Sequence, residues 1–255
     1  MLDLLAARPS STITFVDWDD SILPSTWLSA LGGHGNMTPI EAMAVSQALF
    51  DLERSVIRLL HDLLLVGSVC LVTNAQTGWV ELSCAKFLPN VLPLLAKTKI
   101  VSARTKYEHL DPNAPAQVRF ACFSNLLLTN PPPMQWKLAA FRDELGLDDD
   151  CLGDVNIVSF GDSVYERDAM RCIAQELETC PTILVKTIKL MERPHISELH
   201  SQLEILISCM PDVVAHVGHL DLCLAPQQAP TPPTSPTLQQ SEARLTADPF
   251  CLTTH

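Results

Sequence analysis

The chain of 255 residues carries a formal net charge of −12, with 47% hydrophobic and 18% charged residues. This length and composition fit one sizeable globular domain with a tail, or at most two small domains. The negative charge argues against a general nucleic-acid surface or a surface for anionic membranes, because both need basic patches to neutralise phosphate. A local phosphate site, built from one cation and a few backbone amides, remains compatible with it.

Nine cysteines are irregularly spaced and include no Cys-x-x-Cys pair. We interpret them as small apolar core residues in a reducing compartment rather than as a disulfide framework. The first residues, MLDLLAARPSS, lack the blocks of a secretory signal, and no apolar run reaches the roughly 18 residues of a membrane span. We therefore expect a cytoplasmic protein without membrane or nucleic-acid partners.

Short apolar segments alternate with helical patterns along the chain. A β-branched run at residues 11–17 predicts a strand that stops at acidic residues. A capping box, Thr38-Pro-Ile-Glu41, begins a helix whose apolar residues recur at helical spacing as far as Gly67. Further strands are predicted at 68–73, 99–102, 155–160 and 181–187, and further helices at 79–87, 135–145 and 195–208.

Continuous apolar strands separated by helices indicate a parallel sheet covered on both faces. The predicted fold is α/β, a three-layer Rossmann-like domain over residues 1–225. From 226 to 255 the composition shifts to Pro, Thr, Ser and Gln, which predicts a disordered tail. Ligands of such sheets lie at the carboxyl ends of the strands.

Polar residues occur at those strand ends: Asp17 and Asp19 after the first strand, Thr73 at the end of the second, and Asp162 after the fourth. Crowded carboxylates repel one another and need a cation to stay ionised, and a hard ion such as Mg²⁺ fits oxygen ligands. Alone, an Asp-x-Asp pair is a weak signal, because a solvated acidic turn explains it more simply.

Two further elements strengthen the signal. Lys137 lies near the start of the helix that precedes the fourth strand, and that strand is followed by Gly161-Asp162 and then by Glu166 and Asp168. The order Asp-x-Asp, Thr, Lys, Gly-Asp-x-x-x-Glu resembles the four motifs of the haloacid dehalogenase superfamily, and the resemblance covers roughly residues 13–187. Spacing favours Glu166 as the last acid, with Asp168 as the alternative.

The resemblance implies a role for each motif residue. Asp17 would be the nucleophile that forms an aspartyl-phosphate, and Asp19 would protonate the leaving oxygen and then activate water. Thr73 would hydrogen-bond the phosphoryl group, and Lys137 would balance its charge and that of Asp17. The Mg²⁺ ion would be held by Asp17, the Asp19 main-chain carbonyl, Asp162 and Glu166.

The acid at position 19 favours phosphate ester hydrolysis or transfer, since a superfamily dehalogenase has no acid there. Ser21 stands where the family more often has Thr, and it keeps the hydroxyl. Trp18, between the two aspartates, is expected to point into the core.

Caps provide substrate selectivity in this superfamily, and here little chain is free to form one. Residues 23–37 are too few for a large cap, and residues 104–133 could form a small lid or an insertion. An open site suits a phosphate on a large substrate such as a phosphoprotein, or a site covered by a partner subunit. The alternatives are a catalytically silent binding module and a phosphotransferase, which normally needs a cap to exclude water. Neither the substrate nor the oligomeric state follows from the sequence.

Overall fold

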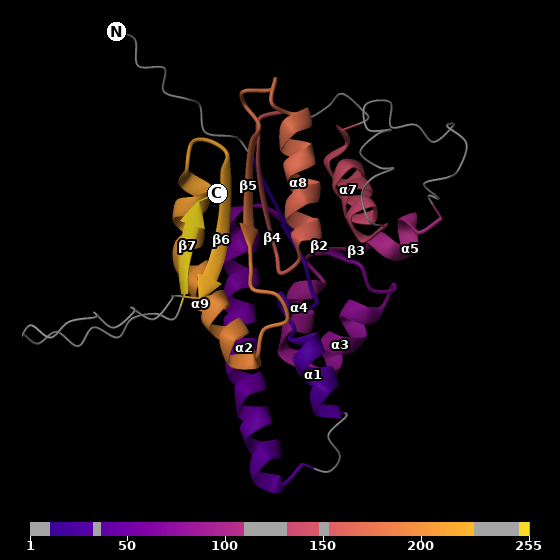
Figure 1. Cartoon of the computed structure of the whole chain (residues 1–255), viewed down its shortest axis with the longest axis vertical. Helices are drawn as coiled ribbons and strands as arrows, with labels where there is room; N and C mark the ends of the chain where they lie inside the picture. Colours follow the sequence, from indigo (N-terminus) through magenta and orange to yellow (C-terminus); the bar gives the residue numbers. More distant parts are fainter. Residues whose placement is uncertain (1–10, 33–36, 110–131, 148–152, 227–249, 255) are drawn as a thin grey trace, which may run out of the picture.

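The computed structural model describes residues 11–32, 37–109, 132–147, 153–226 and 250–254, which form a seven-stranded sheet between helices (Figure 1). The strand order is β3-β2-β1-β4-β5-β6-β7. The first six strands are parallel, and β7 pairs antiparallel with β6 at one edge. The strands are β1 (Ser11–Val16), β2 (Ser68–Thr73), β3 (Lys99–Ser102), β4 (Val155–Gly161), β5 (Leu184–Lys189), β6 (Leu220–Pro226) and β7 (Phe250–Thr254).

Two apolar clusters, one on each face of the sheet, hold the helices in place. The first cluster packs under α2 (Pro39–Val66), α3 (Trp79–Phe87), the 3-10 helix η1 (Pro89–Val91), α4 (Leu92–Leu95) and α9 (Ile196–Ala215). The second packs under α5 (Ala103–Tyr107), α7 (Pro132–Leu145) and α8 (Val164–Glu176). The predicted α/β architecture, a parallel sheet between two helical layers, is confirmed.

The first four predicted strands agree closely with β1 to β4, whereas β5 begins three residues later than the predicted 181–187. Pairing with β4 sets this register, because Leu184 lies opposite Asn156 and Lys189 lies opposite Gly161. The short helix α1 (Ser25–Gly32) and strand β6 were not predicted.

The prediction of a disordered tail from 226 to 255 is wrong for its last residues. Phe250–Thr254 forms β7, and its main chain pairs with that of β6 from Leu222 to Pro226. Composition could not indicate this strand, because its stability comes from hydrogen bonds to a strand distant in the sequence. Residues 227–249 lie outside the described residues.

The long helix α2 has two different halves. Its capping box is formed as predicted, with the Glu41 amide donating to Thr38 Oγ1 at 3.3 Å. The second half packs into the core through Leu52, Val56, Leu59 and Leu63, among others. The first turns are exposed, with Ile40 80% exposed, and together with α1 they extend beyond the carboxyl ends of the strands (Figure 1).

The predicted lid at 104–133 is described only at its ends. Its first residues belong to α5, and α7 begins at Pro132, three residues before the helix start predicted at 135. Residues 110–131 lie outside the described residues. Across the ranges that the structure describes, no helix combines the length and apolarity needed to cross a membrane. Six cysteines in these ranges are free thiols.

Gly67, which joins α2 to β2, provides a test of this packing. A Cβ at this position would lie 2.0 Å from the Thr12 carbonyl oxygen of β1. We expect Gly67→Ala to lower the free energy of unfolding by about 1–3 kcal/mol or more, because the backbone must shift. Thermal or urea unfolding measures the change. Gly32→Ala is the matched control, because a Cβ at this position would meet no atom within 4 Å. We expect this variant to have an unchanged or slightly higher free energy of unfolding.

Candidate functional site: a buried carboxylate cluster at the carboxyl ends of β1 and β4

The chain turns sharply after β1, and this turn separates its acidic residues. The Asp17 amide still donates to the Phe160 carbonyl at 3.1 Å, which continues the sheet by one residue. Trp18 then points into the core, fully buried, with its indole N–H on Ser83 Oγ at 2.9 Å. Its predicted orientation is confirmed. Asp20 caps the turn instead of joining the site, since its carboxylate accepts from the Thr26 amide at 2.9 Å.

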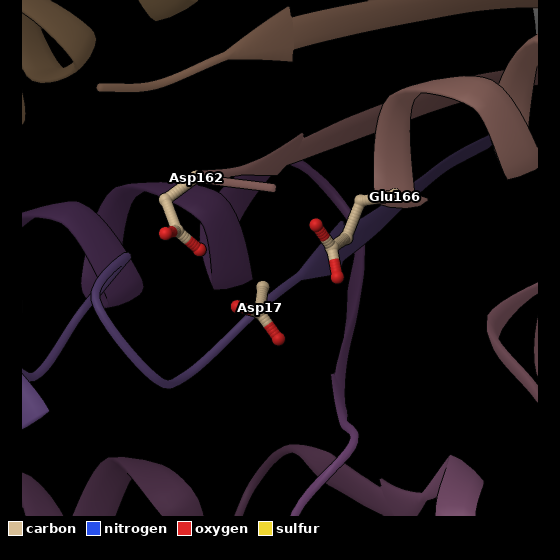
Figure 2. A group of neighbouring side chains, drawn as sticks. All are labelled: Asp17, Asp162 and Glu166. Carbon is tan, nitrogen blue, oxygen red and sulfur yellow. The ribbon is translucent and has the colours of Figure 1, made fainter. Parts of the chain in front are cut away.

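Three carboxylates meet at the centre of this edge. Oxygen atoms of Asp17, Asp162 and Glu166 all lie within 4.8 Å of one another, and all three residues are buried or nearly so (Figure 2). Gly161 allows the approach, because a Cβ there would lie 3.0 Å from Glu166 Cγ and 3.1 Å from Asp17 Cβ. This cluster could bind a metal ion.

Lys137, from α7, is the buried cation of the cluster. Its side chain is fully buried, and its Nζ lies 2.6 Å from Asp17 Oδ1 and 3.1 Å from Glu166 Oε1. The ammonium also donates to the Val72 carbonyl at the end of β2. Burial lowers the pKa of Lys137, but the carboxylates of Asp17 and Glu166 outweigh it and hold that pKa above its usual value. Lys137 is therefore charged at neutral pH.

Glu166 has a second, structural role. Its Oε2 accepts from the Ser163 amide at 3.1 Å and completes the capping box of α8, while Oε1 faces Lys137. The alternative acid, Asp168, lies outside the cluster, with its half-exposed side chain 3.8 Å from Arg171. The geometry therefore favours Glu166 over Asp168, as the spacing predicted.

Ser21 connects the two strand ends. It is fully buried, its hydroxyl accepts from the Asp162 amide at 2.8 Å, and it lies 3.2 Å from Asp17 Oδ2. This linking role was missed by sequence reasoning, which noted only that a hydroxyl was kept. The signal for it was the position of Ser21 four residues after Asp17.

The negative charge of the clustered carboxylates is only partly balanced by nearby positive charge. Burial raises the pKa of Asp17 well above its usual value, against the opposing charge of Lys137, and Glu166 and Asp162 raise it further. Burial, followed by the charges of Glu166 and Asp20, raises the pKa of Asp162 to about 7. Lys137 contacts two of the three acids, and the Lys189 ammonium donates to the main-chain carbonyl of the third, Asp162. A divalent cation would offset the repulsion that remains.

Asp19 lies apart from this cluster and is held by neutral donors. Thr73 Oγ1 donates to its Oδ2 at 3.2 Å, and the indole N–H of Trp79 donates to its Oδ1 at 2.9 Å. Its side chain is not among the carboxylates that could share a metal ion. Thr73 and Asp19 are therefore brought together as neighbours, and Trp79 is a contact that sequence reasoning did not find.

A cavity of about 460 Å³ lies at the other end of the sheet, between α2 and α9. Its lining includes Thr12 and Asn156, from the first residues of β1 and β4, and no member of the carboxylate cluster. The cluster, not this cavity, is the candidate site.

No family model, no curated protein and no solved structure matches this chain. The motif order noted in the sequence and the geometry above are therefore the basis for any functional proposal.

Removal of the Lys137 charge tests the electrostatic balance of the cluster. We expect Lys137→Met to destabilise the protein by about 3–5 kcal/mol at pH 8, because it leaves buried carboxylates without a partner. The loss should shrink at pH 5, because burial raises the pKa of Asp17 and its carboxyl then takes up a proton. Unfolding in urea at both pH values measures it. The exposed pair Lys106–Asp143 supplies the control, since Lys106→Met should cost no more than about 1 kcal/mol.

The raised pKa of Asp162 predicts how stability depends on pH and on metal. Between its ordinary value of 3.8 and about 7, the folded state keeps a proton that the unfolded state releases, so stability without metal falls as pH rises through this window. A divalent cation bound at the cluster would replace that proton. At 100 times its Kd it should add about 2.7 kcal/mol, or roughly 5–10 °C in Tm, at pH 8 and much less at pH 5. An equal Mg²⁺ effect at both pH values, or the same effect in Asp162→Asn, would contradict this assignment.

Proposed function

We propose that this protein is a Mg²⁺-dependent phosphatase of the haloacid dehalogenase type, which hydrolyses a phosphate monoester through an aspartyl-phosphate. The observation that carries the proposal is the contrast between two aspartates only two residues apart. Asp17 is buried among carboxylates and contacts Lys137, whereas Asp19 accepts hydrogen bonds from Thr73 and Trp79 and has no charged contact among the hydrogen bonds and ion pairs of the described residues.

The charges and hydrogen-bond donors around a carboxylate decide whether it acts as a nucleophile or transfers protons, so these two aspartates are suited to different roles. Asp17 is fixed by Lys137 and by the Ser21 hydroxyl, which suits a nucleophile that must hold one direction. Asp19 lies at the same edge on uncharged donors, which suits a group that gives and takes a proton.

The carboxylates fit a hard divalent cation. Asp17, Asp162 and Glu166 supply oxygen ligands within 4.8 Å of one another, and their repulsion is only partly offset by Lys137. These residues, with the Asp19 main-chain carbonyl, would hold Mg²⁺. When bound, the ion would supply positive charge to the phosphoryl oxygens.

The proposed reaction has two steps. In the first, a carboxylate oxygen of Asp17 attacks phosphorus, the bond from phosphorus to the ester oxygen breaks, and Asp19 gives a proton to that oxygen. In the second, Asp19 takes a proton from water, whose oxygen attacks phosphorus and releases inorganic phosphate and free Asp17. Thr73 and Lys137 would position and neutralise the phosphoryl group.

A phosphate on a large substrate such as a phosphoprotein is the proposed target. Beyond the strand ends, the described residues include α1, the first turns of α2, α3 and the start of α9 (Figure 1). None of these segments is a separate cap domain, so the described residues give no support to a phosphotransferase, which needs its reaction enclosed. The free thiols fit the cytoplasmic location expected from the sequence.

The nucleophile assignment is tested with purified protein, an aryl phosphate and Mg²⁺. We expect hydrolysis that requires Mg²⁺ and none detectable with Asp17→Asn. With Asp19→Asn we expect a loss of about 10²–10⁴-fold in kcat, because the second step loses the base that activates water. Asp168→Asn, which changes an exposed acid outside the cluster, is the control and should keep full activity.

Two outcomes would contradict the proposal. Activity that survives Asp17→Asn would exclude this nucleophile. An inactive wild-type protein that also binds neither Mg²⁺ nor beryllofluoride would favour the catalytically silent binding module.

A further inference from the structure

Trp79 makes a contact with the site that packing does not explain. Its indole N–H donates to Asp19 Oδ1 at 2.9 Å, yet the side chain belongs to neither apolar cluster and is 36% exposed. Helix α3 packs instead through Val80, Ser83 and Cys84. A tryptophan that served only the core would be more deeply buried.

The local backbone directs Trp79 toward the site. Gly78 precedes it with φ of 88°, a left-handed conformation that favours glycine, and the Trp79 amide donates to the Gln76 carbonyl at 3.1 Å. This turn follows β2, so Trp79 and Thr73 reach Asp19 from the same connection. Each takes one of its two carboxylate oxygens.

We propose that Trp79 is a positioning residue that holds the Asp19 carboxyl group in the orientation from which it protonates the leaving oxygen. An indole N–H suits this task because it donates only and does not titrate at physiological pH. Its rigid ring also fixes the donor in space at little entropic cost. This inference rests on the proposed phosphatase function and adds a residue to it.

The consequence is a dependence on the leaving group. An alkyl phosphate has a poor leaving group that needs the proton from Asp19, whereas an aryl phosphate leaves without much help. Since kcat/KM covers the steps through aspartyl-phosphate formation, the role of Trp79 should appear in that constant. A purely structural role would lower kcat/KM equally for both substrates.

The kinetic test compares Trp79→Phe with wild-type protein, in the presence of Mg²⁺, on an alkyl and an aryl phosphate. We expect kcat/KM to fall roughly tenfold for the alkyl ester, about the effect of one hydrogen bond, and by less than about threefold for the aryl ester. Trp27→Phe, which removes an indole on α1 that packs edge-on against His195, should leave both values unchanged. Equal losses, or no loss with an active wild type, would overturn the proposal.

A spectroscopic test stands apart from activity. The indole N–H resonance of Trp79, identified by its absence in Trp79→Phe, should shift upfield in Asp19→Ala because its acceptor is removed. The corresponding resonance of Trp27 should stay in place. If the Trp79 resonance does not move, the contact with Asp19 is absent and the inference is overturned, even if the protein is a phosphatase. If the resonance shifts but the wild-type protein is inactive, the contact is present and the proposed phosphatase function is wrong.

Discussion

Two of the three clustered carboxylates contact one buried lysine, and the ends of β1, β2 and β4, together with α7 and the start of α8, are arranged around this group. Lys137 reaches Asp17, Glu166 and the Val72 carbonyl, so one ammonium joins residues from four elements. Burying such charges is expensive unless they are paired and hydrogen-bonded. The tight turns, and the absence of a side chain at Gly161, therefore keep these groups in contact.

The same edge shows how a strand end can separate two identical side chains. In β1 and the residues after it, alternate side chains point to opposite faces, and Trp18 is anchored in the core by Ser83. Asp17 and Asp19 therefore both face the site, but the chain has already turned at Asp19. One carboxylate joins the charged cluster and the other joins the donors that follow β2. The two aspartates thus lie on the same side of the chain, opposite the buried Trp18.

Much of this arrangement could be predicted from the sequence, and the failures share a cause. The strands from 11 to 102 and Lys137 beside Asp17 follow from local patterns and the motif order. The antiparallel strand β7 and the Trp79–Asp19 contact do not, because each depends on a neighbour 24 or more residues away that no local pattern encodes. The start of β5 is likewise set by its pairing with β4, which begins at Leu184 and not at Pro181, where the strand was predicted to begin. Long-range pairing, rather than propensity, decided these cases.

The double use of Glu166 links the chemistry of the site to the dynamics of α8. One oxygen of its carboxylate caps the first turn of the helix and the other faces Lys137, so a change in charge at the cluster reaches the helix terminus through a single side chain. Amide protons in the first turn of a helix exchange with solvent when the cap opens. A cation bound at the cluster would then change the hydrogen exchange of the Ser163 amide, which donates to the Glu166 carboxylate, so this amide reports the ionic state of the site.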